Sequence, residues 1–170
     1  MFDLTDAFLQ PEPGTITYWP AEMDSPVAGT WSIEIPLRPW SADDEYEPDS
    51  YRPGTNGPAH IQASIMLEFI DLPANELDQL SNCHVAYPLN SRPGRAEGSI
   101  YLLACHCPID VSSITFGTAT DDRINVEIHL AFDFVSAGDI DIHNRTAELR
   151  AFLHRASPRQ LRAAFESPSQ

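Results

Sequence analysis

Residues 124–134, INVEIHLAFDF, alternate between apolar and polar side chains along the whole segment. Ile, Val, Leu and Phe occupy every even-numbered position, whereas Asn125, Glu127, His129 and Asp133 lie at odd-numbered ones. A period-two pattern of this length indicates a strand with one buried and one solvent-exposed face, as in antiparallel sheets. This segment therefore decides the fold class, and we expect a mostly β protein.

The same alternation occurs elsewhere in the chain. It is clear in WSIEIPL and HIQASIMLEFIDL, where Ile61, Ala63, Ile65, Leu67 and Phe69 are expected on one face. Shorter apolar runs predict four more strands. The strands expected besides 124–134 are 31–37, 61–69, 15–19, 83–88, 99–107 and 112–118.

Three segments show helical signals. Residues 72–82 begin with a proline after Asp71, a possible N-cap. Residues 145–156 place Leu149, Phe152, Leu153 and Ala156 at helical spacing, and a short helix is expected after Ser157–Pro158. We therefore expect one domain, 1–170, of the α+β class. It is mostly β, an antiparallel sheet or β-sandwich with one or two C-terminal helices at about 145–166.

Size and composition indicate a single soluble globular domain. The chain has 170 residues, of which 42% are hydrophobic, and no apolar run approaches the ~20 residues that span a bilayer. The first residues, MFDLTDAFLQPEPG, carry acids and no base, so we expect no signal peptide and a cytoplasmic protein. All ten basic residues are arginine, which excludes a lysine nucleophile or a P-loop lysine.

Negative charge is the strongest bulk feature of the chain. The formal net charge is −15, and residues 1–80 carry fifteen acids but only two arginines. Residues 145–170 carry two acids and five arginines. An acidic surface repels nucleic acids and anionic membranes and attracts basic proteins. We expect a basic protein partner, with no direct nucleic acid and no membrane.

A long loop over residues 38–59, RPWSADDEYEPDSYRPGTNGPA, separates two expected strands. Loops of this length inside a compact domain are usually functional or disordered. Tryptophan and tyrosine between the acids are side chains that anchor protein interfaces. A mobile linker, or a loop folded back on the sheet through Trp40, remains an alternative. The predicted partner-binding residues are Trp40, Asp43, Asp44, Glu45, Tyr46, Glu47, Asp49 and Tyr51.

The cysteines resemble core residues more than ligands. Cys105 and Cys107 would point to one face of a strand and His106 to the other, with Cys83–His84 upstream. A single C-x-C beside C-H lacks the C-x2-C spacing of zinc sites, and cysteine packs as a small hydrophobe. We interpret the sulfurs as structural.

Two polar rows could carry metal or acid–base chemistry. Asp139, Asp141 and His143 alternate with isoleucines, and their oxygens and imidazole suit a divalent metal. The simpler interpretation is the wet face of a short strand. Glu127, His129 and Asp133 would form an acid–base row only if their face lined a cleft. We therefore expect no catalytic residue and no cofactor.

The leading hypothesis is a non-enzymatic acidic binding protein that neutralises a basic partner. Immunity or antitoxin-type inhibitors of nucleic-acid-acting toxins are the class that fits small size, acidity and the lack of catalytic motifs such as G-x-G-x-x-G or H-E-x-x-H. One alternative is a metal-dependent hydrolase or small-molecule-binding β-protein that uses Asp139, Asp141 and His143. Another is an oligomeric scaffold or accessory domain, in which C-terminal arginines meet the acids of a second copy.

Overall fold

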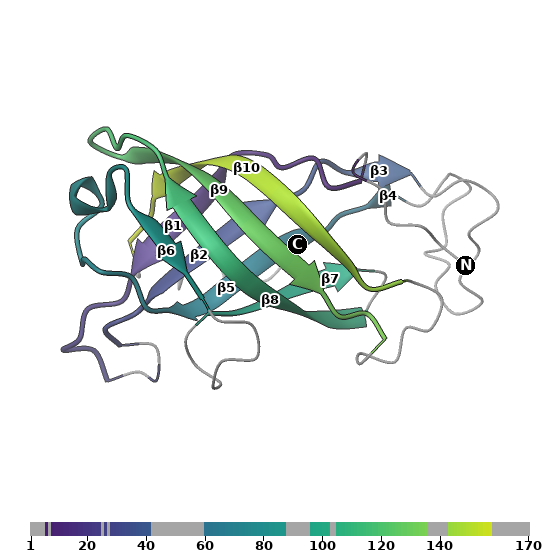
Figure 1. Cartoon of the computed structure of the whole chain (residues 1–170), viewed down its shortest axis with the longest axis horizontal. Helices are drawn as coiled ribbons and strands as arrows, with labels where there is room; N and C mark the ends of the chain where they lie inside the picture. Colours follow the sequence, from purple (N-terminus) through teal and green to yellow (C-terminus); the bar gives the residue numbers. More distant parts are fainter. Residues whose placement is uncertain are drawn as a thin grey trace, which may run out of the picture.

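The computed structural model describes residues 6, 8–24, 26, 28–41, 60–87, 96–102, 105–135 and 143–157. These residues contain ten strands and one short 3-10 helix, η1, which spans Asp78–Leu80 (Figure 1). The strands are β1 (Gly14–Tyr18), β2 (Trp31–Pro36), β3 (Trp40–Ser41), β4 (His60–Ile61), β5 (Ser64–Ile70), β6 (His84–Ala86), β7 (Glu97–Leu102), β8 (Cys105–Phe116), β9 (Arg123–Phe132) and β10 (Arg145–Arg155).

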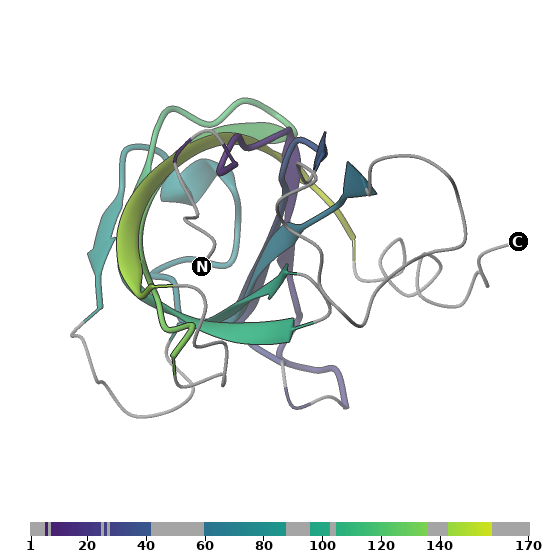
Figure 2. The ribbon, with the colours of Figure 1, turned by 90° about the vertical axis from the view of Figure 1, so that its right-hand side faces the viewer.

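Seven of these strands form a closed barrel in the order β8-β7-β5-β2-β1-β10-β9, with β9 pairing back onto β8. Figure 2 shows the strands as a ring. The β1–β10 pair is parallel, whereas the other neighbours in the ring are antiparallel. The expected open sheet or sandwich is therefore wrong, because closure leaves no free sheet edge among the seven strands.

The alternation that predicted strands also defines the barrel interior. In β9 every even-numbered residue from Ile124 to Phe132 is buried, and the residues between them are exposed or half-buried. β2 shows the same pattern, with Trp31, Ile33 and Ile35 nearly inaccessible to solvent. Because successive side chains of a strand point to opposite sides, the apolar set fills the barrel.

The expected C-terminal helix over 145–156 is wrong, because these residues form β10. Leu149, Ala151 and Leu153 point into the barrel, whereas Arg150 and Phe152 are exposed. β10 pairs with β9 over ten positions and in parallel with β1, so it is the strand that closes the barrel. No C-terminal helix is present among the residues described, and residues 158–170 lie outside them.

The expected helix over 72–82 is also wrong, since only η1 forms there. Leu77 and Leu80 are buried and cover one end of the barrel. The indole nitrogen of Trp31 donates a hydrogen bond to the carbonyl of Ala74 at 2.7 Å, and this bond connects the segment before η1 to β2. Among the described residues, no helix is long and apolar enough to cross a membrane.

The N-terminal segment lies at the other end of the barrel. Leu9 is buried. The Glu12 N–H donates a hydrogen bond to the carbonyl of Pro36 at the end of β2, and the Arg38 N–H donates one to the carbonyl of Gln10. The strands β3 and β4 lie at this end, opposite η1 (Figure 1). The two ends of the barrel are therefore covered by different segments.

Phe69 departs from the expected alternation. It has a positive φ of 55°, and the pairing of β2 with β5 shifts at this point. Phe69 is only half-buried, whereas Ile70 points into the core with no exposed surface. A bulge thus moves the inward position from Phe69 to Ile70.

The expected strand over 99–107 is divided between β7 and β8, which form an antiparallel pair. Cys107 is fully buried in the barrel, which confirms its structural interpretation. His106 is exposed on the outer side. Cys83 lies before β6 and is half-buried, with its sulfur 3.5 Å from the carbonyl oxygen of Gln79.

Candidate functional site

The base of the predicted binding loop is a short two-stranded ribbon. Trp40 pairs with Ile61 and Ser41 with His60, so the two ends of the loop lie side by side. Beyond the backbone of Trp40, the predicted partner-binding residues lie outside the described part of the chain. These are Asp43, Asp44, Glu45, Tyr46, Glu47, Asp49 and Tyr51.

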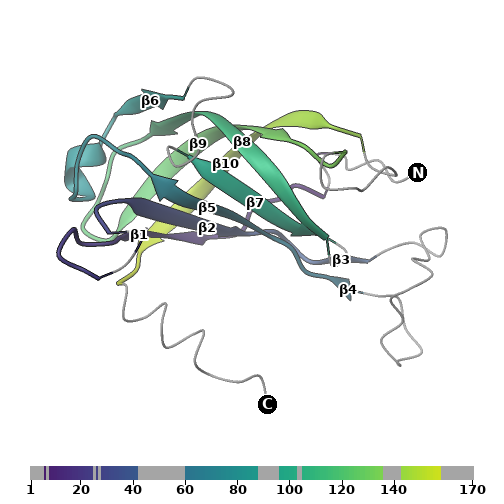
Figure 3. The same ribbon diagram turned by 90° about the horizontal axis from the view of Figure 1, so that it is seen from below.

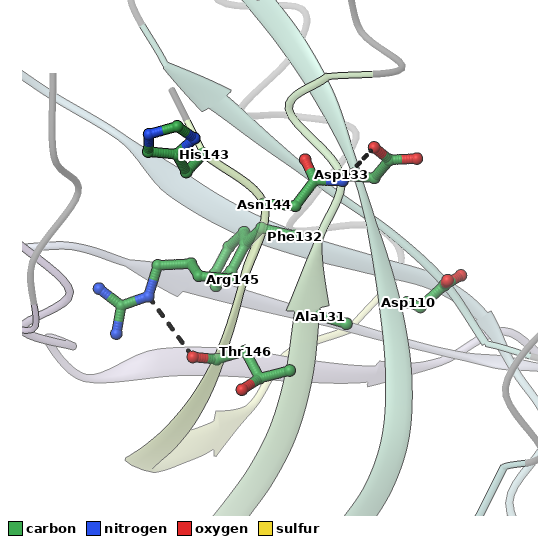
Figure 4. A pocket seen from close by; sticks show the side chains of 8 residues that line it. All are labelled: Asp110, Ala131, Phe132, Asp133, His143, Asn144, Arg145 and Thr146. Atoms are coloured by element: carbon green, nitrogen blue, oxygen red, sulfur yellow. Dashed lines mark hydrogen bonds between the residues drawn. The ribbon is translucent and has the colours of Figure 1, made fainter. Parts of the chain in front are cut away.

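Of the predicted Asp139–Asp141–His143 row, only His143 belongs to the described residues. It is exposed and lines an open groove of about 840 Å³ on the outside of the barrel (Figure 4). Asp139 and Asp141 lie outside the described residues. The proposed metal site of this row therefore stays a prediction.

The groove lies over the end of β9, the start of β10 and the middle of β8. Asp110 of β8 is opposite Ala131 of β9, and Ala131 is opposite Thr146 of β10. The side chain of Ala131 is short and leaves space between its two neighbours. Figure 4 shows Asp110 and Asp133 on one side of the groove and His143 on the other. The lining also includes Arg145, so the groove has both carboxylates and a guanidinium in its walls.

Three contacts hold the strand ends beside the groove. The Asn144 amide donates to Asp133 Oδ1 at 2.9 Å and accepts from the backbone N–H of Val135 at 3.0 Å. Arg145 forms an ion pair with Asp6 of the N-terminal segment. The Asp133 carboxylate thus accepts a hydrogen bond from Asn144 just beyond the end of β9. The acid–base row of Glu127, His129 and Asp133, which required this face to line a cleft, stays untested.

A charged cluster lies on the outer face of β9 and β10, and we call it the β9–β10 cluster: Glu127, His129, Glu148 and Arg150. His129 is directly opposite Glu148, and Glu127 is opposite Arg150. The Arg150 guanidinium contacts Glu127 Oε2 at 3.0 Å and Glu148 Oε1 at 2.8 Å. Glu127 Oε1 lies 3.4 Å from His129 Nε2.

Three members of the cluster have possible metal-ligand atoms close to one another. One atom each from Glu127, His129 and Glu148 lies within 4.8 Å of the other two. Glu127 and His129 belong to the polar row considered from the sequence, but Glu148 was missed because residues 145–156 were expected to form a helix. Its place opposite His129 depends on the β9–β10 register.

The barrel end that carries η1 is rich in carboxylates. The β1–β2 connection, the segment between β5 and β6 and the β8–β9 connection meet there. Tyr18 at the end of β1 pairs with Trp31, and Trp31 pairs with Ile70 at the end of β5. The Asn82 N–H, before β6, donates to the Gly117 carbonyl after β8. Figure 3 shows η1 and the β1–β2 connection at the end opposite β3 and β4. The exposed carboxylates of these connections, which we call the acidic end, are Glu22, Asp24, Asp71, Glu76, Asp78, Asp121 and Asp122.

Two arginines offset part of the charge of the acidic end. Arg155 contacts Glu76 at 2.9 Å, and Arg123 contacts Asp122 at 3.4 Å. Beneath this end the buried Tyr87 donates a hydrogen bond to the carbonyl of Asp71 at 3.2 Å. Burial, and next the Asp71 carboxylate, raise the pKa of Tyr87 well above its ordinary value. Tyr87 therefore stays neutral and serves as a structural contact.

In the alternative of an oligomeric scaffold, C-terminal arginines would meet the acids of a second copy; three of these arginines contact acids of their own chain. Arg145 pairs with Asp6, Arg150 with Glu127 and Glu148, and Arg155 with Glu76, as described above. Arg159 and Arg162 lie outside the described residues.

Comparison of the chain with models of protein families, with curated proteins and with solved structures gives no match.

Proposed function

We propose that this chain is a non-enzymatic acidic binding protein that neutralises a basic protein partner in the cytoplasm. The observation that carries the proposal is the charge: the net charge is −15, and seven exposed carboxylates gather at the acidic end. An immunity or antitoxin role against a nucleic-acid-acting toxin fits this charge, because such toxins bind phosphates with basic surfaces.

Electrostatics would act mainly on the rate of association. An acidic field steers a basic partner toward the protein and speeds encounter at low ionic strength. Ion pairs at an exposed rim add little affinity by themselves. The aromatic residues Trp40, Tyr46 and Tyr51 of the predicted loop would supply the buried anchors of the interface.

The barrel supports this proposal as a scaffold. Its inward-facing side chains on β2, β5, β8 and β9 are nearly all inaccessible to solvent and apolar. Connections that start from strands in a closed, packed ring have fixed ends, so the ring limits how far the residues at those ends can move. Residues whose motion is already limited lose less entropy on binding.

The proposal is tested with partners captured from the native host. A basic protein that co-purifies is then expressed alone, and its affinity is measured at low and high salt. We expect a saturable complex whose association rate falls by more than about tenfold between these conditions. We also expect the activity of the basic protein to be lost at a one-to-one ratio.

Two sets of variants locate the surface. The first set is Asp71→Asn, Asp78→Asn and Asp121→Asn at the acidic end. The second is Asp43→Asn, Asp44→Asn and Glu45→Gln in the predicted loop, which also removes three charges. The matched control removes three charges elsewhere, with Glu12→Gln, Glu34→Gln and Glu68→Gln.

We expect at least one of the two surface sets to slow association by about tenfold or more, and the control set to have a much smaller effect. Thermal unfolding should show that all three proteins are folded. If no basic protein forms a saturable complex, or if the three sets weaken binding equally, the proposal is wrong.

A further inference from the structure

We propose that Glu127, His129 and Glu148 of the β9–β10 cluster form a site for one zinc ion on the outside of the barrel. The proposal does not depend on the protein partner. It concerns residues other than Asp139, Asp141 and His143, and it arises from the register in which the consecutive strands β9 and β10 pair. Imidazole nitrogen with two carboxylate oxygens is a donor set that suits zinc.

The distances agree with this ion. Zinc binds nitrogen and oxygen at about 2.0–2.2 Å, so two ligand atoms at a tetrahedral centre lie about 3.4 Å apart. His129 Nε2 and Glu127 Oε1 lie 3.4 Å apart, and the Glu148 ligand atom is within 4.8 Å of both. A small rotation of the exposed Glu148 side chain would bring its oxygen to the same spacing.

Arg150 positions the carboxylates. It contacts Oε2 of Glu127, which leaves Oε1 of that residue toward His129, and it contacts Oε1 of Glu148. Ligating carboxylates are commonly held by such an outer hydrogen bond. With Arg150 the site keeps a formal charge of −1 when His129 is neutral, so it still attracts a cation.

The site has an open side. His129 and Glu148 also line a hollow of about 490 Å³ whose other walls include Ser112, Ala131 and Thr146. Three protein ligands leave a fourth position of a tetrahedral zinc for water or for an external ligand. Ser112, Ala131 and Thr146 have small side chains, which leave space for that ligand.

The experiment measures zinc binding to chelator-treated protein without a histidine tag, by competition with a chromophoric chelator. Cobalt(II) serves as a spectroscopic probe, because its visible absorption distinguishes tetrahedral from octahedral coordination. We expect one zinc per chain and a tetrahedral cobalt spectrum. His129→Ala and Glu148→Gln should each weaken zinc binding by at least about tenfold.

His154→Ala is the matched control, because His154 lies on the same side of β10 as Glu148 but outside the group of ligand atoms. It should bind zinc like the unaltered protein. The proposal is overturned if the unaltered protein binds no zinc, or if His129→Ala and His154→Ala bind it equally. An octahedral cobalt spectrum in the unaltered protein would overturn the proposed coordination even if the variants failed to fold.

Discussion

The inner and outer faces of the β9–β10 pair differ in what each residue does. On the inner face, Ile128 and Leu149 are opposite each other, and both are almost completely buried. On the outer face, His129 and Glu148 are opposite each other and remain partly exposed. The same backbone therefore carries a packed core on one side and charged groups on the other. The free energy of unfolding should therefore depend mainly on the inner face, and ligand binding on the outer face.

The largest effect is expected from Leu149→Ala on the inner face. Removing a fully buried leucine leaves a cavity and should lower the free energy of unfolding by about 2–5 kcal/mol. Urea denaturation followed by tryptophan fluorescence measures this loss. Thr146→Ala on the outer side of the same strand is the control and should change it by less than about 0.5 kcal/mol. Equal losses would contradict the assignment of faces.

A smaller loss is expected from Gly14→Ala where β1 joins the ring. A Cβ atom at this position would lie 2.2 Å from the carbonyl oxygen of Glu34, so the two strands would have to separate. We expect a loss of about 1–3 kcal/mol, as for other overpacked sites, measured by thermal unfolding. Thr15→Ala, one residue further along β1, is the comparison. No destabilisation by Gly14→Ala would contradict the close β1–β2 approach.

Arg150→Met should have little effect on stability. The Arg150 side chain is 73% exposed, and its ion pairs with Glu127 and Glu148 are screened by water. We expect the free energy of unfolding to change by no more than about 1 kcal/mol. The same denaturation assay measures it. A loss as large as that of Leu149→Ala would mean that the outer cluster stabilises the fold.

The smallest effect is expected from Phe152→Ser. Phe152 is 59% exposed on the outer face of β10, so little apolar surface returns to water when it is replaced. A change within about 0.5 kcal/mol is expected in the free energy of unfolding. A clearly larger loss would show that Phe152 is covered in solution.

Part of the fold could be predicted from local pattern alone. Strict alternation over 31–37 and 124–134 correctly marked β2 and β9, because in a pleated strand each second residue points the same way. It failed at Phe69, where a bulge changes the phase. Of the candidate sites, the sequence identified Glu127 and His129 but could not supply their third partner.

The sequence by itself determined the strong negative charge, the β character and the apolar set that fills the barrel. Whether residues 145–155 form a helix or a strand depends on tertiary pairing. These residues favour a helix by composition, yet Leu149, Ala151 and Leu153 also satisfy a period of two. Pairing with β9 and β1 selects the strand, because it buries these side chains and satisfies backbone hydrogen bonds on both sides. The same β9–β10 pairing places Glu148 beside His129, and it therefore creates the cluster.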